Sequence, residues 1–558
     1  MRRFQATSVL LLSCLLAGTA VAAEVTPGTI RETLPEAGPG LPETQAEPPL
    51  APAPAVPKVP EGGPKILIRR FEISGNEAIP TEELHRQIAD YEGKRLTLLE
   101  IYGVADLLTR YYRSRGYTLA TVTVPAQEVA SGVVRLHVIE GRVGKISFEG
   151  NRIYDEEFLR RQFDRIRPGD ILRDDPLQNE LLLLNDLPGL TARSVLAPGE
   201  EFGTTDLILE TQERRFEGTA GINNHGNVAV GEWRAVATVN YNNPTGHGDY
   251  FGFTYLHGEA GELDFGQLDY EVALNTSGTR AHFYYSRNVY NVRSGAFGAA
   301  FSGSRRDGDG ETFGAWLSHP FRRTLDDTLI GTLEFTRILT RQTGSGALTV
   351  TADQKQDALT LLRLGARWTH LYRDQRSVST LGATFSTNFR RSDYTAAGLL
   401  RQNREPGKFQ LDFSHYHDMR GDWSVLIRGS GAYSIGPLND LDRFRIGGPT
   451  SIRAFAQGEL SGDAGVWAGM DLMHPLPFRL PFDAPVQLRA FYDVGVVYNK
   501  NPAAGGKKTD TLSGTGVGAT IQFGRDYSFD FMTAVPTTAH DAGDQRDIRY
   551  WASLNARF

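Results

Sequence analysis

The chain has very little cysteine and no apolar run long enough to cross a membrane as a helix. Cys14 is the only cysteine among 558 residues, which excludes disulfide bonds within the chain. The apolar stretch from Val9 to Leu16 falls far short of the roughly 18 residues that a membrane-spanning helix needs. The net charge is −7 and no basic stripe is present, so the sequence predicts no nucleic-acid partner.

Glycine and aromatic residues, by contrast, are plentiful. The chain has 60 glycines, and aromatic residues make up 10% of it while charged residues make up 22%. This composition fits neither a helical membrane protein nor a disordered chain. Because 558 residues exceed the size of one compact domain, we expect several units.

Residues 1–23 predict a secretory signal peptide. Arg2 and Arg3 precede the apolar stretch, and the segment ends in the run Ala-Val-Ala at 20–22, which is the order of a leader with an A-x-A cleavage site. Lipid attachment at Cys14 is disfavoured because further apolar residues follow it. Cleavage of this leader would remove the only cysteine.

Residues 24–64 contain 11 of the 28 prolines, which predicts a semi-extended linker. The range 26–36 has room for one or two helical turns, and Pro35 limits their length. The sequence leaves open whether this segment is a plain linker or includes a short regulatory helix that plugs a pore.

Residues 65–141 and 142–212 predict two consecutive α+β units with the same order of strand, helix, helix, strand and strand. In the first unit, Thr97 and Glu100 form the pattern of a capping box at the start of the second helix. The elements of the first unit are expected at residues 66–73, 80–91, 97–116, 122–124 and 133–139. Those of the second unit are expected at residues 143–148, 155–163, 177–184, 191–196 and 205–210. A repeat of this kind within about 150 residues indicates two copies of one module.

Four motifs in these units resemble a known module. They are Phe71-Glu72-Ile73-Ser74-Gly75-Asn76, the Y-x-x-x-G-Y pattern at 112–117, Leu187-Pro188-Gly189 and Pro198-Gly199. Together they are similar to the POTRA (polypeptide-transport-associated) modules of outer-membrane secretion and assembly proteins. The resemblance implies that both units lie in the periplasm.

Residues 213–558 predict a transmembrane antiparallel β-barrel of about 16 strands. Period-2 alternation rich in aromatic and β-branched residues recurs between turn clusters, for example at 233–241 and 423–433. Short and long connections alternate, as in outer-membrane barrels. The long ones are expected at 292–310, 340–355 and 434–463. The chain ends on the aromatic Phe558, which resembles the terminal signal of such barrels.

Two motifs in the barrel region resemble a matched pair in the two-partner-secretion transporter (TpsB) family. One is R-I-G-G-P-T-S-I-R-A-F at 445–455, and the other is F-Y-D-V-G at 491–495. In that family the Arg of an inward-folded loop meets the Asp of a barrel strand, which implies a pair between Arg453 and Asp493. The other motif residues carried over are Gly447, Gly448, Ile452 and Phe455 in the loop and Phe491 and Gly495 on the strand.

The loop motif departs from the family at one position, where Ala454 stands in place of the usual Gly. Alanine adopts a positive φ only at a cost. The sequence therefore leaves the backbone conformation of the tip open.

The resemblance implies a transporter that takes an unfolded exoprotein from the periplasm to the cell surface, with the barrel in the outer membrane. Expected partners are a secreted β-rich exoprotein with an N-terminal secretion domain, outer-membrane lipid and the barrel assembly machinery. The exoprotein is expected at exposed strand edges of the POTRA-like units, because strand addition uses backbone groups. No cofactor is predicted.

Three alternatives remain: an assembly factor that inserts other barrels, a passive porin and an outer-membrane enzyme. Assembly factors usually carry more POTRA units, a porin does not need them, and no connected catalytic set is found. The glycine run at 514–518 is not followed by a helix, which disfavours a phosphate loop. His415, His417 and Asp418 lack a fourth metal ligand. The identity of the exoprotein stays open.

Overall fold

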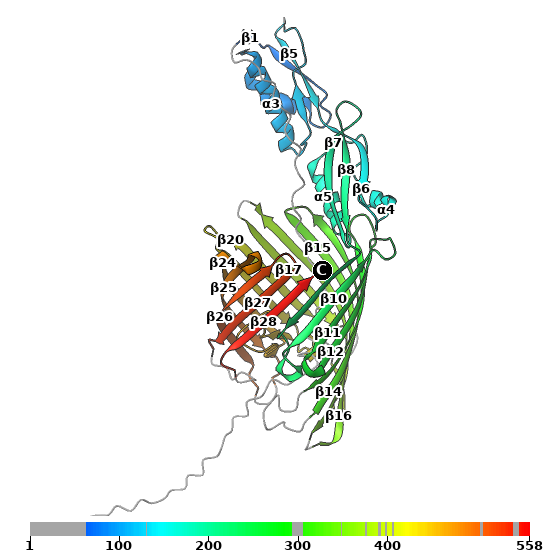
Figure 1. Cartoon of the computed structure of the whole chain (residues 1–558), viewed down its shortest axis with the longest axis vertical. Helices are drawn as coiled ribbons and strands as arrows, with labels where there is room; N and C mark the ends of the chain where they lie inside the picture. The colour runs from blue at the N-terminus through cyan, green and yellow to red at the C-terminus, as the bar shows by residue number, and fades with distance from the viewer. Residues whose placement is uncertain are drawn as a thin grey trace, which may run out of the picture.

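The computed structural model shows two small α+β modules above a closed β-barrel (Figure 1). It describes residues 63–558 except 130, 293–304, 347–348, 374–375, 389–391, 397–398, 404–406, 503–505 and 539–545. The predicted signal peptide, and the predicted linker up to residue 62 with its candidate helix at 26–36, lie outside the described residues. Within the described ranges, no helix combines the length and the apolarity needed to cross a membrane.

The first module packs two helices against a three-stranded sheet of order β2-β5-β4. Its elements are β2 (Arg70–Ser74), α2 (Thr81–Ile88), α3 (Leu98–Ser114), β4 (Thr121–Thr123) and β5 (Val133–Ile139). The predicted capping box is confirmed, because Thr97 Oγ1 accepts from Glu100 N at 3.3 Å and the Glu100 carboxylate accepts from Thr97 N at 2.6 Å. From this start, α3 buries Ile101, Leu108 and Tyr112 in the core.

The prediction of one strand over residues 66–73 is wrong. β1 (Ile66–Leu67) pairs with β3 (Arg95–Leu96) in a separate ribbon, whereas β2 runs parallel to β5 in the sheet. The chain changes partner at Ile68, whose N–H donates to Lys94 O at 2.9 Å and whose side chain is fully buried. The apolar periodicity of residues 66–73 continues across this point, so it could not predict that the chain changes its pairing partner here.

The second module repeats the plan with sheet order β6-β8-β7. Its elements are β6 (Arg142–Glu149), α4 (Glu156–Gln162), α5 (Asp174–Asn185), β7 (Leu190–Pro198) and β8 (Thr204–Glu213). The first barrel strand begins at Phe216. Arg214 and Arg215 are therefore the whole connection between the module and the barrel.

In the part of the chain that the structure describes, sixteen strands form the antiparallel ring that was predicted. β17 pairs directly with β20, so the hairpin of β18 (Ser392–Ala396) and β19 (Leu399–Asn403) extends from the ring without interrupting it. The ring strands are β9 (Phe216–Asn223), β10 (Arg234–Asn242), β11 (Tyr250–Gly258), β12 (Leu263–Ala273), β13 (Arg280–Val292), β14 (Arg305–Arg323), β15 (Asp327–Gly346), β16 (Thr349–Tyr372), β17 (Ser377–Asn388), β20 (Lys408–Asp418), β21 (Ser424–Ser434), β24 (Ala464–Leu480), β25 (Ala484–Tyr498), β26 (Thr509–Phe523), β27 (Tyr527–Pro536) and β28 (Arg549–Arg557).

One of the predicted long connections is wrong. β15 and β16 continue through most of 340–355, and Gly346 pairs with Thr349 at the end of the hairpin. β16 begins with Thr349 and Val350, and β-branched residues of this kind favour strands. Most of the connection at 292–310 lies outside the described residues, while the one at 434–463 is confirmed between β21 and β24.

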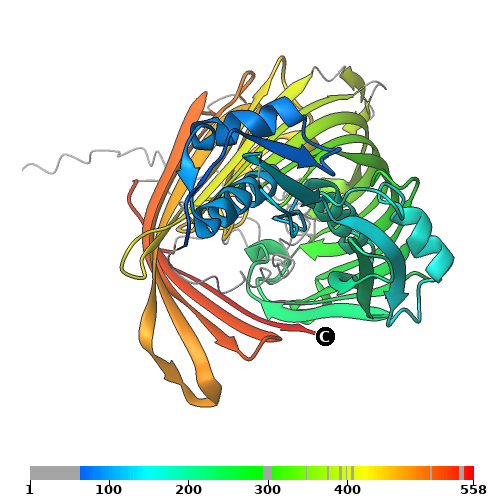
Figure 2. The same cartoon turned by 90° about the horizontal axis from the view of Figure 1, so that it is seen from above.

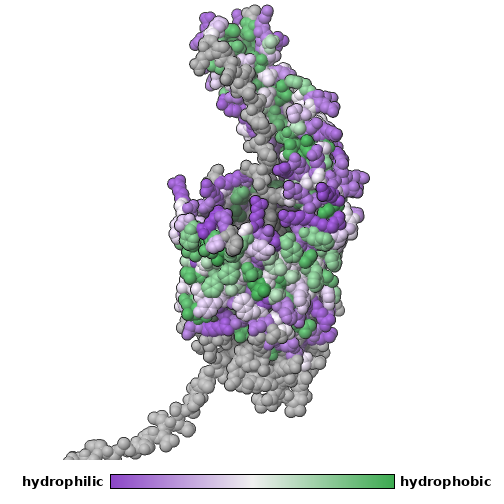
Figure 3. Space-filling model, viewed as in Figure 1, coloured by the Kyte–Doolittle hydropathy of each residue, from purple (hydrophilic) through white to green (hydrophobic). Residues whose placement is uncertain are grey.

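A band of apolar residues runs across the visible face of the barrel (Figure 3). On β11, Phe251, Phe253 and Tyr255 are exposed, whereas Gly252 and Thr254 between them are buried. This alternation places every second side chain on the lipid side. An apolar surface of this extent requires contact with a membrane or a partner.

The last residue takes part in closing the barrel. β28 pairs with β9 over the five residues Ser553 to Arg557. Beyond them, Phe558 N donates to Gly218 O at 3.0 Å and Gly218 N donates to Phe558 O at 2.9 Å. A Cβ on Gly218 would lie 2.5 Å from the Phe558 ring, so glycine leaves room for the terminal aromatic side chain.

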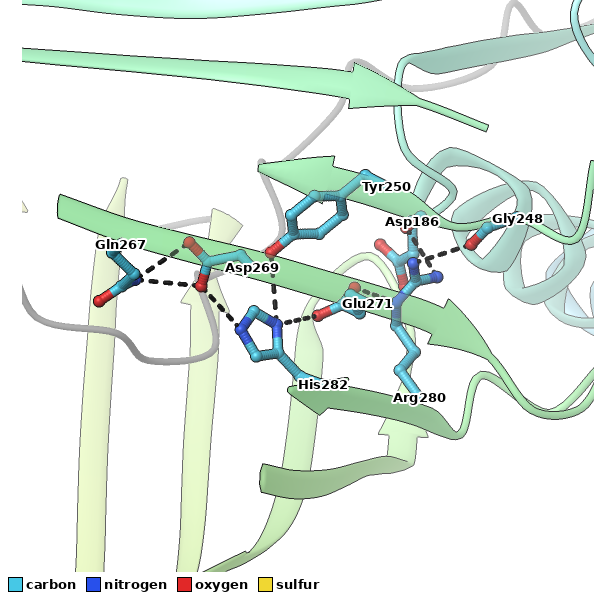
Figure 4. A network of polar contacts seen from close by, with 8 residues as sticks. All are labelled: Asp186, Gly248, Tyr250, Gln267, Asp269, Glu271, Arg280 and His282. Atoms are coloured by element: carbon cyan, nitrogen blue, oxygen red, sulfur yellow. Dashed lines mark hydrogen bonds and ion pairs between the residues drawn. The ribbon is translucent and has the colours of Figure 1, made fainter. Parts of the chain in front are cut away.

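Asp186, the residue that follows α5, attaches the second module to the mouth of the barrel. The first module projects over this mouth (Figure 2). Asp186 accepts from Arg323 Nε and Nη2 at 3.0 and 2.9 Å, and its main-chain oxygen accepts from Arg280 at 3.4 Å. Arg280 also pairs with Glu271, which contacts His282 in the barrel wall (Figure 4). We refer to Asp186, Arg280 and Arg323 as the mouth clamp.

The same helix buries a carboxylate that has no hydrogen bond. Glu180 is fully buried, and neither of its oxygens has a hydrogen-bond partner in the described part of the chain. Arg165 Nε lies 3.3 Å away but is partly exposed. Burial raises the pKa of Glu180 to about 7, and the attraction of Arg165 offsets only part of this shift.

We predict that the second module loses stability as the pH rises from about 4.5 to about 7. In this window the unfolded chain loses the proton of Glu180 while the folded module retains it, so the free energy of unfolding falls by at most about 3 kcal/mol. Glu180→Gln should remove most of this dependence. Urea unfolding followed by helical circular dichroism measures it, because the described α-helices all lie in the modules. Wild-type pH dependence in Glu180→Gln would contradict the assignment.

Candidate functional site

The connection between β21 and β24 folds into the barrel. It contains η6 (Asp440–Asp442), β22 (Phe444–Ile446) and β23 (Leu460–Gly462). We call residues 447–459 the loop tip; all of them except Thr450 are buried. Gly447 and Gly448 have φ of 110° and 105°, a conformation that other residues adopt only at a cost. Gly448 N donates to the carbonyls of Ile452 and Phe455 at 3.2 and 3.1 Å and so closes the tip into a compact turn.

Arg453 lies in the middle of the loop tip and is 1% exposed. Its Nε and Nη2 each donate to Asp493 on β25 at 2.8 Å, and its backbone N donates to the same carboxylate at 3.1 Å. Nη1 and Nη2 also donate to Asp471 on β24 at 2.8 and 2.5 Å. Both carboxylates are buried. One guanidinium therefore bridges two carboxylates, with two hydrogen bonds to each.

Two aromatic side chains complete the enclosure of Arg453. The ring centroid of Phe491 lies 3.6 Å from Arg453 Cζ, within the range of a cation–π contact. The indole N–H of Trp551 donates to the Arg453 carbonyl at 2.7 Å. Arg453 is thus held by β24, β25 and the last strand, β28.

The structure brings the loop residues and strand residues named from the sequence together. Ile452, Phe455 and Phe491 are buried in one apolar cluster. Gly495 faces Ile452, because a Cβ there would lie 3.3 Å from Ile452 Cδ1. Gly447 forms the turn that precedes them, where its N–H donates to Ser451 Oγ at 2.9 Å.

Sequence reasoning missed Asp471 and Trp551. Asp471 stands opposite Phe491 in the register of β24 and β25, so an acidic residue on the lumen face beside a motif residue was the available signal. The sequence contains no signal for Trp551, because its contact with Arg453 depends on the position of β28 relative to the loop tip.

Ala454 does not have the backbone conformation that would strain it. In the described residues, positive φ outside glycine is confined to Asn243, Arg376, Asp422 and Asp483. The alanine at this position therefore fits the loop tip without left-handed backbone, and its methyl group is directed at Gly514 on β26.

The charges around Arg453 balance. Arg428 lies close enough to interact with Asp471 and Asp493, and its Nη1 donates to the Thr450 carbonyl at 3.1 Å. Arg489 also lies close to Arg428 but pairs with Asp530 at 3.2 Å. Two cations, Arg453 and Arg428, therefore face the two carboxylates. Removal of one partner from a buried group of this kind is expensive, about 3–5 kcal/mol, because a charge is left without compensation.

The other patterns found in the sequence form no site. Among the described residues, no three His, Cys, Asp or Glu side chains are placed to hold a metal ion. His415 and His417 instead contact Ser379 and Ser377 at 2.8 and 2.5 Å. The glycine run at 514–518 lies inside β26.

A family model described as haemolysin secretion/activation protein ShlB/FhaC/HecB matches residues 203–521. The chain belongs to this family. A second model, the POTRA domain of the ShlB type, matches residues 66–141. The chain is therefore an outer-membrane transporter of the two-partner-secretion type, whose modules lie in the periplasm and which acts with a secreted exoprotein.

Named relatives of the chain are transporters. The heme/hemopexin transporter protein HuxB of Haemophilus influenzae (strain 86-028NP) is 25% identical over 495 residues, which cover 87% of this chain and 85% of HuxB. The outer membrane transporter CdiB of Escherichia coli O6:K15:H31 (strain 536 / UPEC) is 24% identical over 504 residues, which cover 88% and 82%. The solved structure of CdiB from Escherichia coli has the same fold, with a TM-score of 0.68 over 91% of this chain and 94% of that chain at 21% identity.

We predict that Arg453→Ala lowers the thermal stability of the folded barrel and that adding Asp471→Asn restores part of it. The single change leaves two carboxylates for the one remaining cation, Arg428, whereas the double variant has equal charges again. The temperature at which the folded barrel loses its compact electrophoretic mobility measures this. Equal stability of the single and double variants would show that charge balance is not what holds the site.

Proposed function

We propose that the chain takes an unfolded exoprotein from the periplasm and passes it through the barrel to the cell surface, while the loop tip leaves its docked position. The observation that carries this proposal is the loop tip, which is buried in the barrel and tied to its wall by Arg453. The names of the relatives support transport over barrel assembly and over catalysis.

We call the contacts of Arg453 with Asp471 and Asp493 the loop lock, because they hold the loop tip inside the lumen. A tied segment inside the lumen blocks the path of a polypeptide, so it has to move while a client passes. The contacts of Arg453 set the cost of that movement, and folding of the client outside the cell supplies the bias in its direction. Outer-membrane lipid contacts the apolar band in this proposal, and the barrel assembly machinery inserts the chain.

Most strand edges of the modules are partly occupied by the protein itself. β2, β4 and β6 each have an outer backbone N–H that is already bonded within the module. The contacts are Phe71 N to the Glu92 carboxylate and Val122 N to Thr109 Oγ1, both at 2.9 Å, and Val143 N to Asp170 O at 2.8 Å. Occupied edges of this kind resist strand addition.

β7 leaves part of its edge open for a client. Asn185 caps the edge at Ala192, accepting from its N–H at 2.6 Å and donating to its carbonyl at 2.9 Å. Outward backbone groups alternate along an antiparallel strand, so those of Leu196 face the same side. Leu196 is partly exposed, whereas Ser194 before it is buried. Phe202, which is 89% exposed at the following turn, adds apolar surface beside this edge. An extended client can pair here through backbone groups alone.

We predict that Arg453→Ala and Asp493→Ala each reduce the exoprotein in the medium by about tenfold or more. Each change leaves a buried charge unpaired, so the loop tip no longer takes the docked position from which, in this proposal, transport starts. Arg479→Ala and Asp483→Ala are the matched controls, since they break an exposed pair at 2.6 Å. The assay compares barrels that are inserted to equal amounts. Normal secretion by the two lock variants would rule out a role for this pair.

We predict that Leu196→Pro reduces secretion while Leu196→Ala does not. Proline removes the outward N–H that a client strand would use, whereas alanine keeps it. Helical circular dichroism checks that the modules remain folded, and cross-linking of the client to β7 reports binding directly. Equal secretion by both variants would place the client on another edge.

A further inference from the structure

Ala454 in the loop tip and Gly514 on β26 are matched in size. A Cβ built on Gly514 would lie 2.2 Å from Ala454 Cβ and 3.5 Å from Ala454 Cα. Non-bonded carbon atoms settle at about 3.5–4.0 Å, so the space admits one methyl group and not two. In this chain the loop supplies that methyl group.

Gly514 also belongs to the cross-strand row that contains Asp493. Gly469 pairs with Asp493, and Asp493 pairs with Gly514, in the register of β24, β25 and β26. Asp493 therefore stands between two positions without a side chain. The gap on the β26 side lets the loop backbone approach, so that Arg453 N reaches the Asp493 carboxylate at 3.1 Å.

The next glycine of β26 serves the lock in the same way. A Cβ on Gly516 would lie 2.4 Å from Cζ of Phe491, the ring that lies against the Arg453 guanidinium. The absence of side chains at Gly514 and Gly516 thus leaves room on β26 for the loop tip and for the ring of Phe491.

We infer that Gly514 is a positioning residue of the loop lock and that positions 454 and 514 form one steric slot with room for a single methyl group. The inference rests on the proposed function, in which the docked loop tip has to stay close enough to Asp493 for Arg453 to reach its carboxylate. Two methyl groups in the slot lift the tip away from Asp493, whereas moving the one methyl group from the loop to the strand preserves docking. In the exchanged pair the nearest loop atom to the strand methyl is Ala454 Cα at 3.5 Å, an ordinary contact. Val535 O on β27 lies 3.1 Å from that methyl group and has to shift by a few tenths of an ångström.

The test compares Gly514→Ala, the exchange Ala454→Gly with Gly514→Ala, and a control, Gly382→Ala. Gly382 is a strand glycine whose added Cβ would be 3.6 Å from its nearest neighbour. Docking is measured without the client, as the rate at which a thiol reagent labels Ser451→Cys in a Cys14→Ser background. Ser451 is buried in the docked tip. Secretion of the exoprotein is measured in parallel.

We expect Gly514→Ala to raise the labelling rate about tenfold through overpacking and to lower secretion, and the exchange to reverse both changes. The control should behave as the wild type. Wild-type labelling of Gly514→Ala, or equal labelling of Gly514→Ala and the exchange, would overturn the slot. If Gly514→Ala does not insert, Ala454→Val, which leaves β26 unchanged, must raise the labelling rate instead, and unchanged labelling then overturns the slot. If labelling follows expectation while secretion stays normal, the slot stands and the role of the lock in secretion falls.

Discussion

The pairing of one buried guanidinium with two buried carboxylates is the interaction on which the position of the loop tip depends. Arg453 is carried on a connection that enters the lumen, and it reaches Asp471 and Asp493 on neighbouring strands. Charges taken out of water are tolerated only when their hydrogen bonds are satisfied and their signs balance. Both conditions are met in the docked position, which gives the loop tip a defined place in the barrel. If the tip leaves that place, the carboxylates lose the hydrogen bonds of Arg453.

The strand that closes the barrel is also the strand that holds the loop. Trp551 donates to the Arg453 carbonyl, and two residues further along the same strand begins the short pairing with β9 that ends at Phe558 and Gly218. A displacement of the loop tip therefore removes a hydrogen bond from the last strand. β28 therefore takes part both in holding the loop tip and in closing the barrel. In the proposed mechanism, a client that moves the loop tip would also affect the pairing of β28 with β9.

The modules combine firm attachment with a limited free surface. The mouth clamp joins the end of α5 to the barrel through the bidentate contact of Arg323 with Asp186, while only Arg214 and Arg215 connect the two parts covalently. Internal caps such as Glu92 on β2 protect strand edges from uncontrolled pairing. A transporter for unfolded chains has to expose some edge and protect the others, and the arrangement of caps around β7 meets both needs.

The features that could be predicted from the residues alone rest mostly on local patterns. Local patterns predicted three features: the capping box of Thr97, the order of the two modules and the ring of sixteen strands. These patterns are apolar periodicity and short-range hydrogen bonds, which depend on residues close together in the chain. Resemblance to a family added Arg453 and Asp493. Three features became visible only in three dimensions: the change of strand partner at Ile68, the extended hairpin of β15 and β16, and the contacts of Arg453 with Asp471 and Trp551. These depend on register and on which side chains meet across strands far apart in the chain. A period-2 pattern determines the face on which a side chain lies but does not distinguish registers that differ by two residues.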